Sequence, residues 1–164
     1  IFVGVSTGGQ IMGIANYYKL RYPHVEIIGV DVEGSKIFSE NGHHYKMTGV
    51  GLSFHPPNLN IEKIDGAYIV SESLSYSICN SMAKKEGLLL GASSGAIIAA
   101  GLNYTLNYGP SARVLMIIPD RGDRYLETVY NREWLDENKF ELFGDEEIKK
   151  EIKALRPIRF KDFI

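Results

Sequence analysis

Hydrophobic residues recur along the chain in short runs of strand length. Five such runs cover residues 1–5, 25–32, 67–70, 88–90 and 113–118. Their largely continuous, β-branched character is typical of strands that are covered on both faces. The pattern therefore predicts the strands of a mostly parallel sheet.

Longer segments between these runs place their apolar residues on one side of a helix. They cover residues 9–22, 72–86 and 94–107. Ser71 is placed to cap the second of these helices, and Gly87 is placed to end it. Strands that alternate with helices in this way predict an α/β domain.

Two stretches depart from the alternation. Residues 39–60 hold several Gly and Pro residues and three of the four histidines, which predicts either a mobile loop at the mouth of a site or a surface excursion. Near the C-terminus, an amphipathic pattern from Asp145 predicts a short helix followed by an extended tail that docks on the domain. We therefore divide the chain into an α/β domain, residues 1–140, and a C-terminal helix and tail, residues 141–164.

The N-terminus lies inside an apolar run, without an initiator Met or a signal-peptide pattern. A strand needs partners on its sides, so we expect the chain to be the C-terminal piece of a longer protein. A start created by processing is the alternative.

Composition narrows the function classes. The 164 residues carry a formal net charge of -2, and the sequence pI is near 6.1, which argues against nucleic-acid binding. No apolar run approaches the ~18 residues of a membrane span, so we expect no membrane partner and a cytoplasmic protein. A single cysteine, Cys79, excludes a disulfide framework, and His43, His44 and His55 lack the spacing of a metal site.

The most informative turn joins the first predicted strand to the first helix. It consists of Ser6, Thr7, Gly8, Gly9 and Gln10. Small residues allow an anion to approach the free N–H groups of the helix start, so the turn predicts a phosphate site, although a plain connection would also use glycines. The turn lacks the G-x-G-x-x-G pattern of dinucleotide folds, but Asp31 stands where their ribose-binding acid would be. A nicotinamide-dinucleotide module is therefore an alternative.

Two further polar turns follow predicted strands. One runs from Gly91 to Ala96 and contains Ser93, and the other begins at Pro119 and Asp120. Ligands collect at the carboxyl ends of parallel strands, so we expect the three turns to line one crevice.

Taken together, these motifs resemble the cysteine synthase and cystathionine β-synthase family, which are pyridoxal-phosphate enzymes of fold type II. Ser6 to Gln10 is similar to the G-T-G-G-T phosphate loop of that family, Gly91 to Ala96 to its G-I-S-S-G-A turn, and Pro119 to Leu126 to its P-D-x-G-E-R-Y-L segment. Glu33-Gly34-Ser35, Gly49-Val50-Gly51 and Glu86-Gly87-Leu88-Leu89 follow the family's order and spacing. The resemblance extends from residue 1 to about residue 138.

The resemblance implies the C-terminal part of a three-layer αβα large domain, with pyridoxal phosphate as cofactor. Its phosphate would lie on Ser6, Thr7, Gly8, Gly9 and Gln10. Ser93 would bind the pyridine nitrogen, or alternatively cap its helix. Gly49, Gly51, Pro119 and Asp120 would support the cofactor or line the substrate side, and Asp120 would serve mainly to hold the turn.

Two departures from the family pattern affect this expectation. Ser6 and Gln10 replace the first Gly and the last Thr of the phosphate loop. The lysine that forms the Schiff base lies in the N-terminal half of the family, and no Lys of this chain stands in the S-x-K context of that motif. We therefore expect the 164 residues alone to be inactive and to need the missing N-terminal half.

The family also implies a reaction and partners. A hydroxyl at the pyridine nitrogen makes the ring a weaker electron sink than a carboxylate would, which favours loss of a β-leaving group and addition of a nucleophile. We expect a homodimer that makes cysteine from O-acetylserine and sulfide. Residues 125–140 resemble cystathionine β-synthases, and residues 33–38 resemble phosphoserine-using 2,3-diaminopropionate synthases, so these reactions are alternatives. A paralogue that keeps the fold without catalysis is another.

Overall fold

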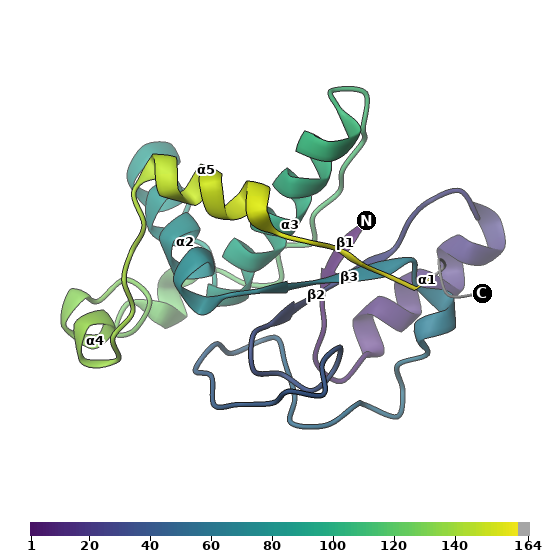
Figure 1. Cartoon of the computed structure of the whole chain (residues 1–164), viewed down its shortest axis with the longest axis horizontal. Helices are drawn as coiled ribbons and strands as arrows, with labels where there is room; N and C mark the ends of the chain where they lie inside the picture. Colours follow the sequence, from purple (N-terminus) through teal and green to yellow (C-terminus); the bar gives the residue numbers. More distant parts are fainter. Residues whose placement is uncertain (161–164) are drawn as a thin grey trace.

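A computed structural model of the chain describes residues 1–160 and places a four-stranded sheet between helices (Figure 1). The strands are β1 (Phe2–Gly4), β2 (Ile28–Val32), β3 (Gly66–Val70) and β4 (Ile158–Arg159). The helices are α1 (Gly9–Arg21), α2 (Glu72–Glu86), α3 (Ala92–Tyr108), α4 (Arg132–Glu137) and α5 (Asp145–Ala154), with short 3₁₀ turns η1 (Ile61–Lys63) and η2 (Gly122–Tyr125).

The sheet has the order β1-β2-β3-β4. The first three strands are parallel, with Ile28 opposite both Phe2 and Gly66. The fourth strand lies antiparallel to β3 at the edge. The mostly parallel sheet of the α/β prediction is thus confirmed.

Each face of the sheet carries its own apolar core. Alternate residues of β2, such as Val30 and Val32, pack on the side of α2, α3 and α5. Val3, Val5 and Ile27 belong to a second cluster with α1 and the loop segments after β2. Figure 1 shows the two sides, with α2, α3 and α5 above the sheet and α1 and the long loop below it. The result is the three-layer arrangement that the resemblance implies.

Helix ends follow the predicted local chemistry. The Ser71 hydroxyl accepts the Leu74 N–H at 3.3 Å at the start of α2, and Gly87 ends α2 in the left-handed region with φ of 67°. Helix α3 begins at Ala92, two residues before the prediction, with Gly91 as its N-cap. No helix of the described residues is long and apolar enough to cross a membrane.

Two predicted strands are absent as strands in the described part of the chain. Residues 113–118 make a single parallel bridge from Met116 to Phe2, and residues 88–90 make a single antiparallel bridge from Leu90 to Arg121. Both runs leave large apolar side chains exposed, among them Leu88 and Leu115. An apolar run predicts burial, but a strand also needs a neighbour with which to pair along its length.

The C-terminal segment docks onto the same core. Asn103 of α3 donates to the Ile152 carbonyl of α5 at 2.7 Å and accepts from the Tyr68 hydroxyl of β3 at 2.9 Å. Gly66 lets β4 approach, because a Cβ there would lie 2.5 Å from the Ile158 carbonyl oxygen. The tail thus joins the sheet edge through residue 160, and its last residues, 161–164, lie outside the described residues.

Candidate active site

The predicted phosphate turn connects β1 to α1. Gly8 has a φ of 84° and precedes the first helical residue without a side-chain cap. The first helical hydrogen bond is donated by Met12 to the Gly8 carbonyl, so the N–H groups of Gly9, Gln10 and Ile11 lie ahead of the hydrogen-bonded turns. Thr7, Gly9 and Gln10 are exposed. An anion can therefore reach these donors and the positive end of the helix dipole.

A second segment, residues 49–51, lies beside this turn. The Gly51 N–H donates to the Val5 carbonyl at 2.8 Å, and the Ser6 hydroxyl donates to the Gly51 carbonyl at 3.3 Å. Gly49 and Gly51 have φ of 92° and 85°, which favours glycine at both positions. Gly4 allows this segment to pack against β1, because a Cβ at Gly4 would lie 2.8 Å from the Val50 side chain.

Ser93 faces the other end of the 49–51 segment. A Cβ on Gly49 would lie 3.1 Å from the Ser93 hydroxyl oxygen. Ser93 is 1% exposed, and its hydroxyl has no hydrogen-bond partner within the described residues. It does not cap α3, since Gly91 holds the N-cap position. The alternative reading of Ser93 as a helix cap is therefore wrong.

The third turn is attached to the second. The Gly91 N–H donates to the Asp120 carbonyl at 3.2 Å, and the Asp120 carboxylate accepts the Tyr125 hydroxyl at 2.7 Å. Thr48 donates to the Tyr125 oxygen at 3.3 Å. Asp120 thus holds Tyr125, as expected of a residue that fixes the turn, while Pro119 is exposed beside it. These contacts connect the predicted turns through residues 48–51.

The arrangement fits the cofactor implied by the resemblance. A buried hydroxyl without a partner needs an acceptor or donor from a bound group, and Ser93 offers one. Glycine 49 leaves the space beside that hydroxyl free of a side chain. The N–H groups of residues 9–11 precede the hydrogen-bonded turns of α1 and would suit an anion. The residues present therefore suit a ring with a hydrogen-bonding nitrogen and a phosphate.

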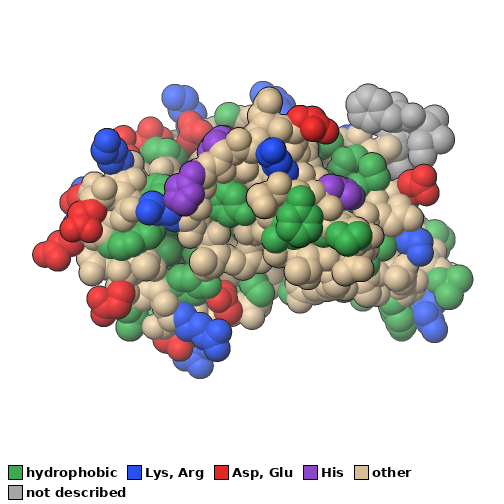
Figure 2. All heavy atoms as spheres, turned by 90° about the horizontal axis from the view of Figure 1, so that it is seen from below, with side chains coloured by type: hydrophobic (Ala, Val, Ile, Leu, Met, Phe, Trp, Pro, Cys, Tyr) green, Lys and Arg blue, Asp and Glu red, His purple; other side chains and the backbone are tan. Residues whose placement is uncertain are grey.

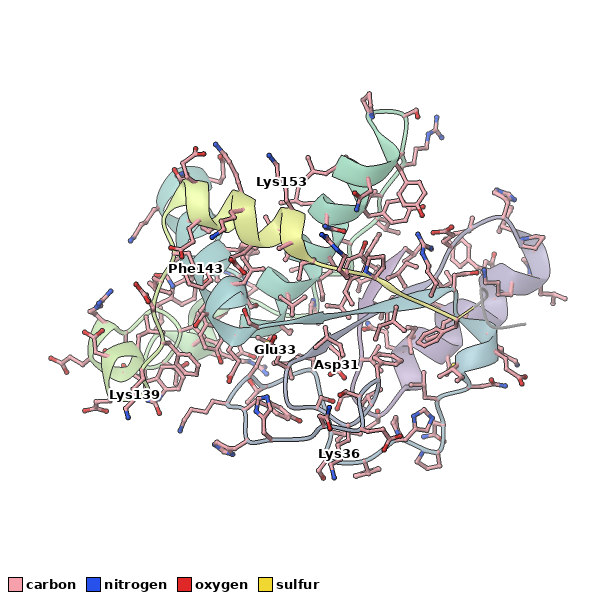
Figure 3. All side chains as sticks on the ribbon, in the orientation of Figure 1. Asp31, Glu33, Lys36, Lys139, Phe143 and Lys153 are labelled. Carbon is pink, nitrogen blue, oxygen red and sulfur yellow. The ribbon has the colours of Figure 1, made fainter. Side chains whose placement is uncertain are left out.

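Asp31 is placed differently from the expectation for a dinucleotide module. It is 0% exposed on β2, and Figure 3 shows it between the sheet and the loop that carries Lys36. Its Oδ1 accepts the Val32 N–H at 2.9 Å. Burial raises the pKa of Asp31 to about 6. A ribose hydroxyl would not reach a carboxylate in this position, so the structure gives the dinucleotide alternative no support.

Residues 39–60 form the long loop, which lies next to the predicted phosphate turn. Its apolar residues Met47, Val50 and Leu59 are buried, and Leu59 is 3.3 Å from the Cβ position of Gly8. Figure 2 views the molecule from this side, on which histidine side chains reach the surface. The predicted border of the site by residues 39–60 is consistent with these contacts, while the mobility of the loop stays a prediction.

Metal and thiol chemistry find no support among residues 1–160. They contain no group of three or more His, Cys, Asp or Glu side chains able to hold a metal ion. His55 contacts the carbonyls of Ile37 and Leu59, each at 3.2 Å. Cys79 is fully buried, and burial raises the pKa of its thiol to about 12, which makes it a core residue and not a nucleophile.

No sequence pattern predicted the polar groups that lie between the loop and the third turn. Thr48 and Tyr125 meet although they are 77 residues apart, and Lys46 lies near them on a cavity wall. Tyr125 belongs to the segment from Pro119 to Leu126, so that motif could have drawn attention to it. Nothing in the local pattern around Lys46 or Thr48 indicates their position.

Comparison with known proteins identifies the family. The family described as pyridoxal-phosphate dependent enzyme matches residues 1–120. The chain is 34% identical over 139 residues to N-(2-amino-2-carboxyethyl)-L-glutamate synthase of Cupriavidus metallidurans, covering 82% of this chain and 40% of that protein. The chain thus spans less than half the length of this curated relative.

Solved structures agree with this match. The O-acetylserine dependent cystathionine β-synthase of Helicobacter pylori has a TM-score of 0.71 and 37% identity, over 79% of this chain and 43% of that one. O-Acetyl serine sulfhydrylase isoform 3 of Entamoeba histolytica, at 23% identity, shares the fold with a TM-score of 0.76, over 93% and 44% of the two chains. The chain therefore belongs to the family of pyridoxal-phosphate-dependent enzymes, and it is similar to fold type II enzymes of the cysteine synthase and cystathionine β-synthase type.

Proposed function

We propose that the full-length protein catalyses a pyridoxal-phosphate-dependent β-replacement on an O-activated serine. The observation that carries the proposal is the buried, unpartnered Ser93 hydroxyl, held beside Gly49 and connected through residues 49–51 to the anion-binding turn. When bound, pyridoxal phosphate stabilises negative charge at the substrate Cα. The named activities of the relatives in Cupriavidus and Helicobacter support the same class.

The chain's own residues would divide the work as follows. Ser6 to Gln10 would hold the phosphate through backbone N–H groups and side-chain hydroxyl and amide donors. Ser93 would hydrogen-bond the ring nitrogen without the charge that a carboxylate would bring. Gly49 and Gly51 would let the backbone approach the ring, and Asp120 would position Tyr125. The lysine that binds the cofactor covalently is expected in the part of the protein outside these 164 residues.

A product assay on the full-length holoenzyme tests the class and the acceptor. O-Acetylserine and O-phosphoserine are each combined with sulfide, homocysteine or glutamate, and products are identified by mass spectrometry. We expect one activated serine to give a β-substituted product. Sulfide, which yields cysteine, is the acceptor favoured by the motifs, whereas the product named for the Cupriavidus relative carries the new bond on a glutamate nitrogen. Cofactor binding without any product would favour a non-catalytic paralogue and contradict the proposal.

The Ser93→Ala variant tests the ring-nitrogen role. In the cofactor-free protein, alanine removes a buried hydroxyl that has no partner, so the free energy of unfolding is expected to stay the same or rise slightly. In the holoenzyme, we expect a shift of the cofactor absorption band and a loss of cofactor affinity of about tenfold, as for one lost hydrogen bond to a buried group. Ser94→Ala serves as the control, because Ser94 is buried beside it but is not in contact with Gly49.

We also propose that the full-length protein is a homodimer, as the resemblance implies, and that it is located in the cytoplasm. Light scattering on the full-length protein measures the first part, and localisation of a tagged chain the second.

A further inference from the structure

A cavity of about 190 Å³ lies beside the Thr48–Tyr125 contact, and both of these residues line it. Its polar lining comes from the long loop, from η2 and from the segment after η2, and α2 and α4 add the aromatic side chains of Tyr76 and Trp134. The side chains of the polar lining are Lys46, Thr48, Arg124, Tyr125 and Thr128. Cations, hydroxyls and an indole thus share one small hollow.

The cavity adjoins the proposed cofactor site. Ala92, the residue before Ser93, forms part of its wall. Thr48, on another wall, precedes Gly49, whose Cβ position is 3.1 Å from the Ser93 hydroxyl oxygen. A molecule in the cavity would therefore stand next to the place where a ring bound to Ser93 would lie.

Within residues 1–160, the two cations at the cavity have no charged partner. Neither the Lys46 ammonium nor the Arg124 guanidinium makes an ion pair or a hydrogen bond with a described residue. Two neighbouring carboxylates are each bonded through one oxygen, and Asp120 Oδ1 is buried without a partner among the described residues. Glu72 accepts the Lys46 N–H and the Tyr76 hydroxyl, both at 2.8 Å, and Asp120 accepts the Tyr125 hydroxyl.

Unpaired cations beside hydroxyl groups match a carboxylate. The indole of Trp134 offers an apolar surface for the carbon chain that bears such a group. Sulfide has neither a carboxylate nor a carbon chain, so the cavity would contribute nothing to its recognition. An amino acid has both.

We propose that this cavity binds the carboxylate of an amino-acid nucleophile, the second substrate of the β-replacement, through Lys46 and Arg124. This inference rests on the β-replacement proposed above, and it departs from the sulfide acceptor that the motifs favour. In that reaction the Cβ–O bond of the activated serine breaks and the nucleophile's nitrogen or sulfur forms the new bond to Cβ. The proton lost by the nucleophile balances the released acetate or phosphate as the free acid.

A substitution of Lys46 tests the proposal more specifically than a substitution of Arg124. Arg124 belongs to the Pro119–Leu126 segment, which resembles the family motif, whereas Lys46 lies outside every motif quoted for the resemblance. Lys46 is also exposed and contributes only its backbone N–H to the hydrogen bond with Glu72. A Lys46→Gln change therefore removes the charge without breaking a described side-chain contact.

The kinetic test uses the full-length holoenzyme with either glutamate or homocysteine, and with sulfide, as acceptor. Lys46→Gln and Arg124→Gln are each expected to raise the KM for the amino acid about tenfold or more, as for the loss of one charge-assisted hydrogen bond. The kcat/KM for sulfide is expected to stay within about twofold of the parent value. Arg121→Gln is the control, because Arg121 is in the same segment but its side chain is 90% exposed and outside the cavity.

A binding readout does not depend on turnover. Trp134 lies in the cavity wall and is the single tryptophan of these 164 residues. We expect glutamate or homocysteine, added without an activated serine, to change the fluorescence of the full-length holoenzyme. The change should disappear in Trp134→Phe and move to at least about tenfold higher concentrations in Lys46→Gln.

The outcomes separate this inference from the proposed function. Product formation only with sulfide would overturn the inference and leave the β-replacement intact. Equal losses with sulfide and with the amino acid would also overturn it, since the two cations would then support the fold or the cofactor. No product with any acceptor would refute the proposed function itself, while the fluorescence titration would still report whether the cavity binds amino acids.

Discussion

At the scale of single residues, the described core holds buried polar groups that are costly when they lack a partner. Ser93 keeps a buried hydroxyl without a partner, and Asp31 keeps a buried carboxylate whose Oδ2 has none within the described residues. Each such group lowers stability unless a ligand or a proton satisfies it. Ser93 stands at the proposed ring nitrogen, whereas Asp31 is enclosed between β2 and the loop after it. The two therefore call for different tests.

Asp31 predicts a pH-dependent stability. Its folded-state pKa of about 6 lies above the ordinary value of 3.8, so the folded chain keeps this proton to a higher pH than the unfolded chain does. Protonated Asp31 therefore contributes on the order of 3 kcal/mol to the free energy of unfolding below about pH 4. This contribution is lost as the pH rises through about 6. Asp31→Asn cannot ionise and still offers Oδ1 to the Val32 N–H.

We expect Asp31→Asn to be more stable than the parent near pH 8 and to lack most of that pH-dependent loss. Urea denaturation of the full-length protein near pH 5 and near pH 8 measures both. Asp123→Asn is the matched control, because the Asp123 side chain is 65% exposed. An unchanged pH dependence in Asp31→Asn would show that another group causes it.

Residue patterns predicted part of the site. The turn at residues 6–10 and Ser93 could be found because each follows an apolar run and precedes a helical one. The hydrogen bonds that connect Asp120, Tyr125 and Thr48 could not be found in this way. They join loop residues that are far apart in the sequence, through side-chain hydroxyls. No local periodicity records such a contact. The cavity that these residues border was missed for the same reason.

At the scale of elements, the alternation of apolar runs and helical periods predicted three strands and the three long helices. The short α4 was missed, although Asn131 caps it by accepting the N–H groups of Glu133 and Trp134. Strand β4 was also missed, because two residues are too few to show a period. Residues 88–90 and 113–118 were overpredicted, because hydrophobicity does not indicate whether a pairing partner lies alongside.

The packing of α2 against α3 gives a test at this scale. The two helices approach closely at Gly95, where a Cβ would overlap the Ser75 carbonyl group. Gly95→Ala is therefore expected to lower the free energy of unfolding by about 1–3 kcal/mol or more, since two backbones would have to separate. This shift would also displace the start of α3 and reduce cofactor affinity.

Gly13→Ala in α1 provides the opposite expectation. A Cβ at residue 13 would have no neighbour within 4 Å. Alanine at this helical position should raise the free energy of unfolding by about 0.5–1 kcal/mol, because it lowers the entropy of the unfolded chain. Chemical denaturation of both variants and the parent under the same conditions measures these changes in the free energy of unfolding. If Gly95→Ala were as stable as the parent, α2 and α3 would not pack as closely as described.

At the scale of the whole molecule, the described core holds together the parts that the sequence analysis divided. Helix α5 packs with α2 and α3 in one cluster, and β4 extends the sheet. The contacts of the predicted phosphate turn, by contrast, come from β1, α1, the 49–51 segment and Leu59, all within the 164 residues. Phosphate recognition should therefore be separable from covalent cofactor binding, for which the resemblance implies a lysine outside these 164 residues.

The chain of 164 residues, produced by itself, is accordingly expected to bind inorganic phosphate while remaining colourless with pyridoxal phosphate and inactive. In amide NMR spectra, phosphate should shift the resonances of Gly9, Gln10 and Ile11, whose N–H groups precede the hydrogen-bonded turns of α1. Gly8→Ala is expected to abolish these shifts, since Gly8 has a φ of 84° and Leu59 lies 3.3 Å from its Cβ position. Shifts confined to other residues would mean that the turn does not form an anion site from local backbone alone, and that its phosphate contacts require the rest of the enzyme.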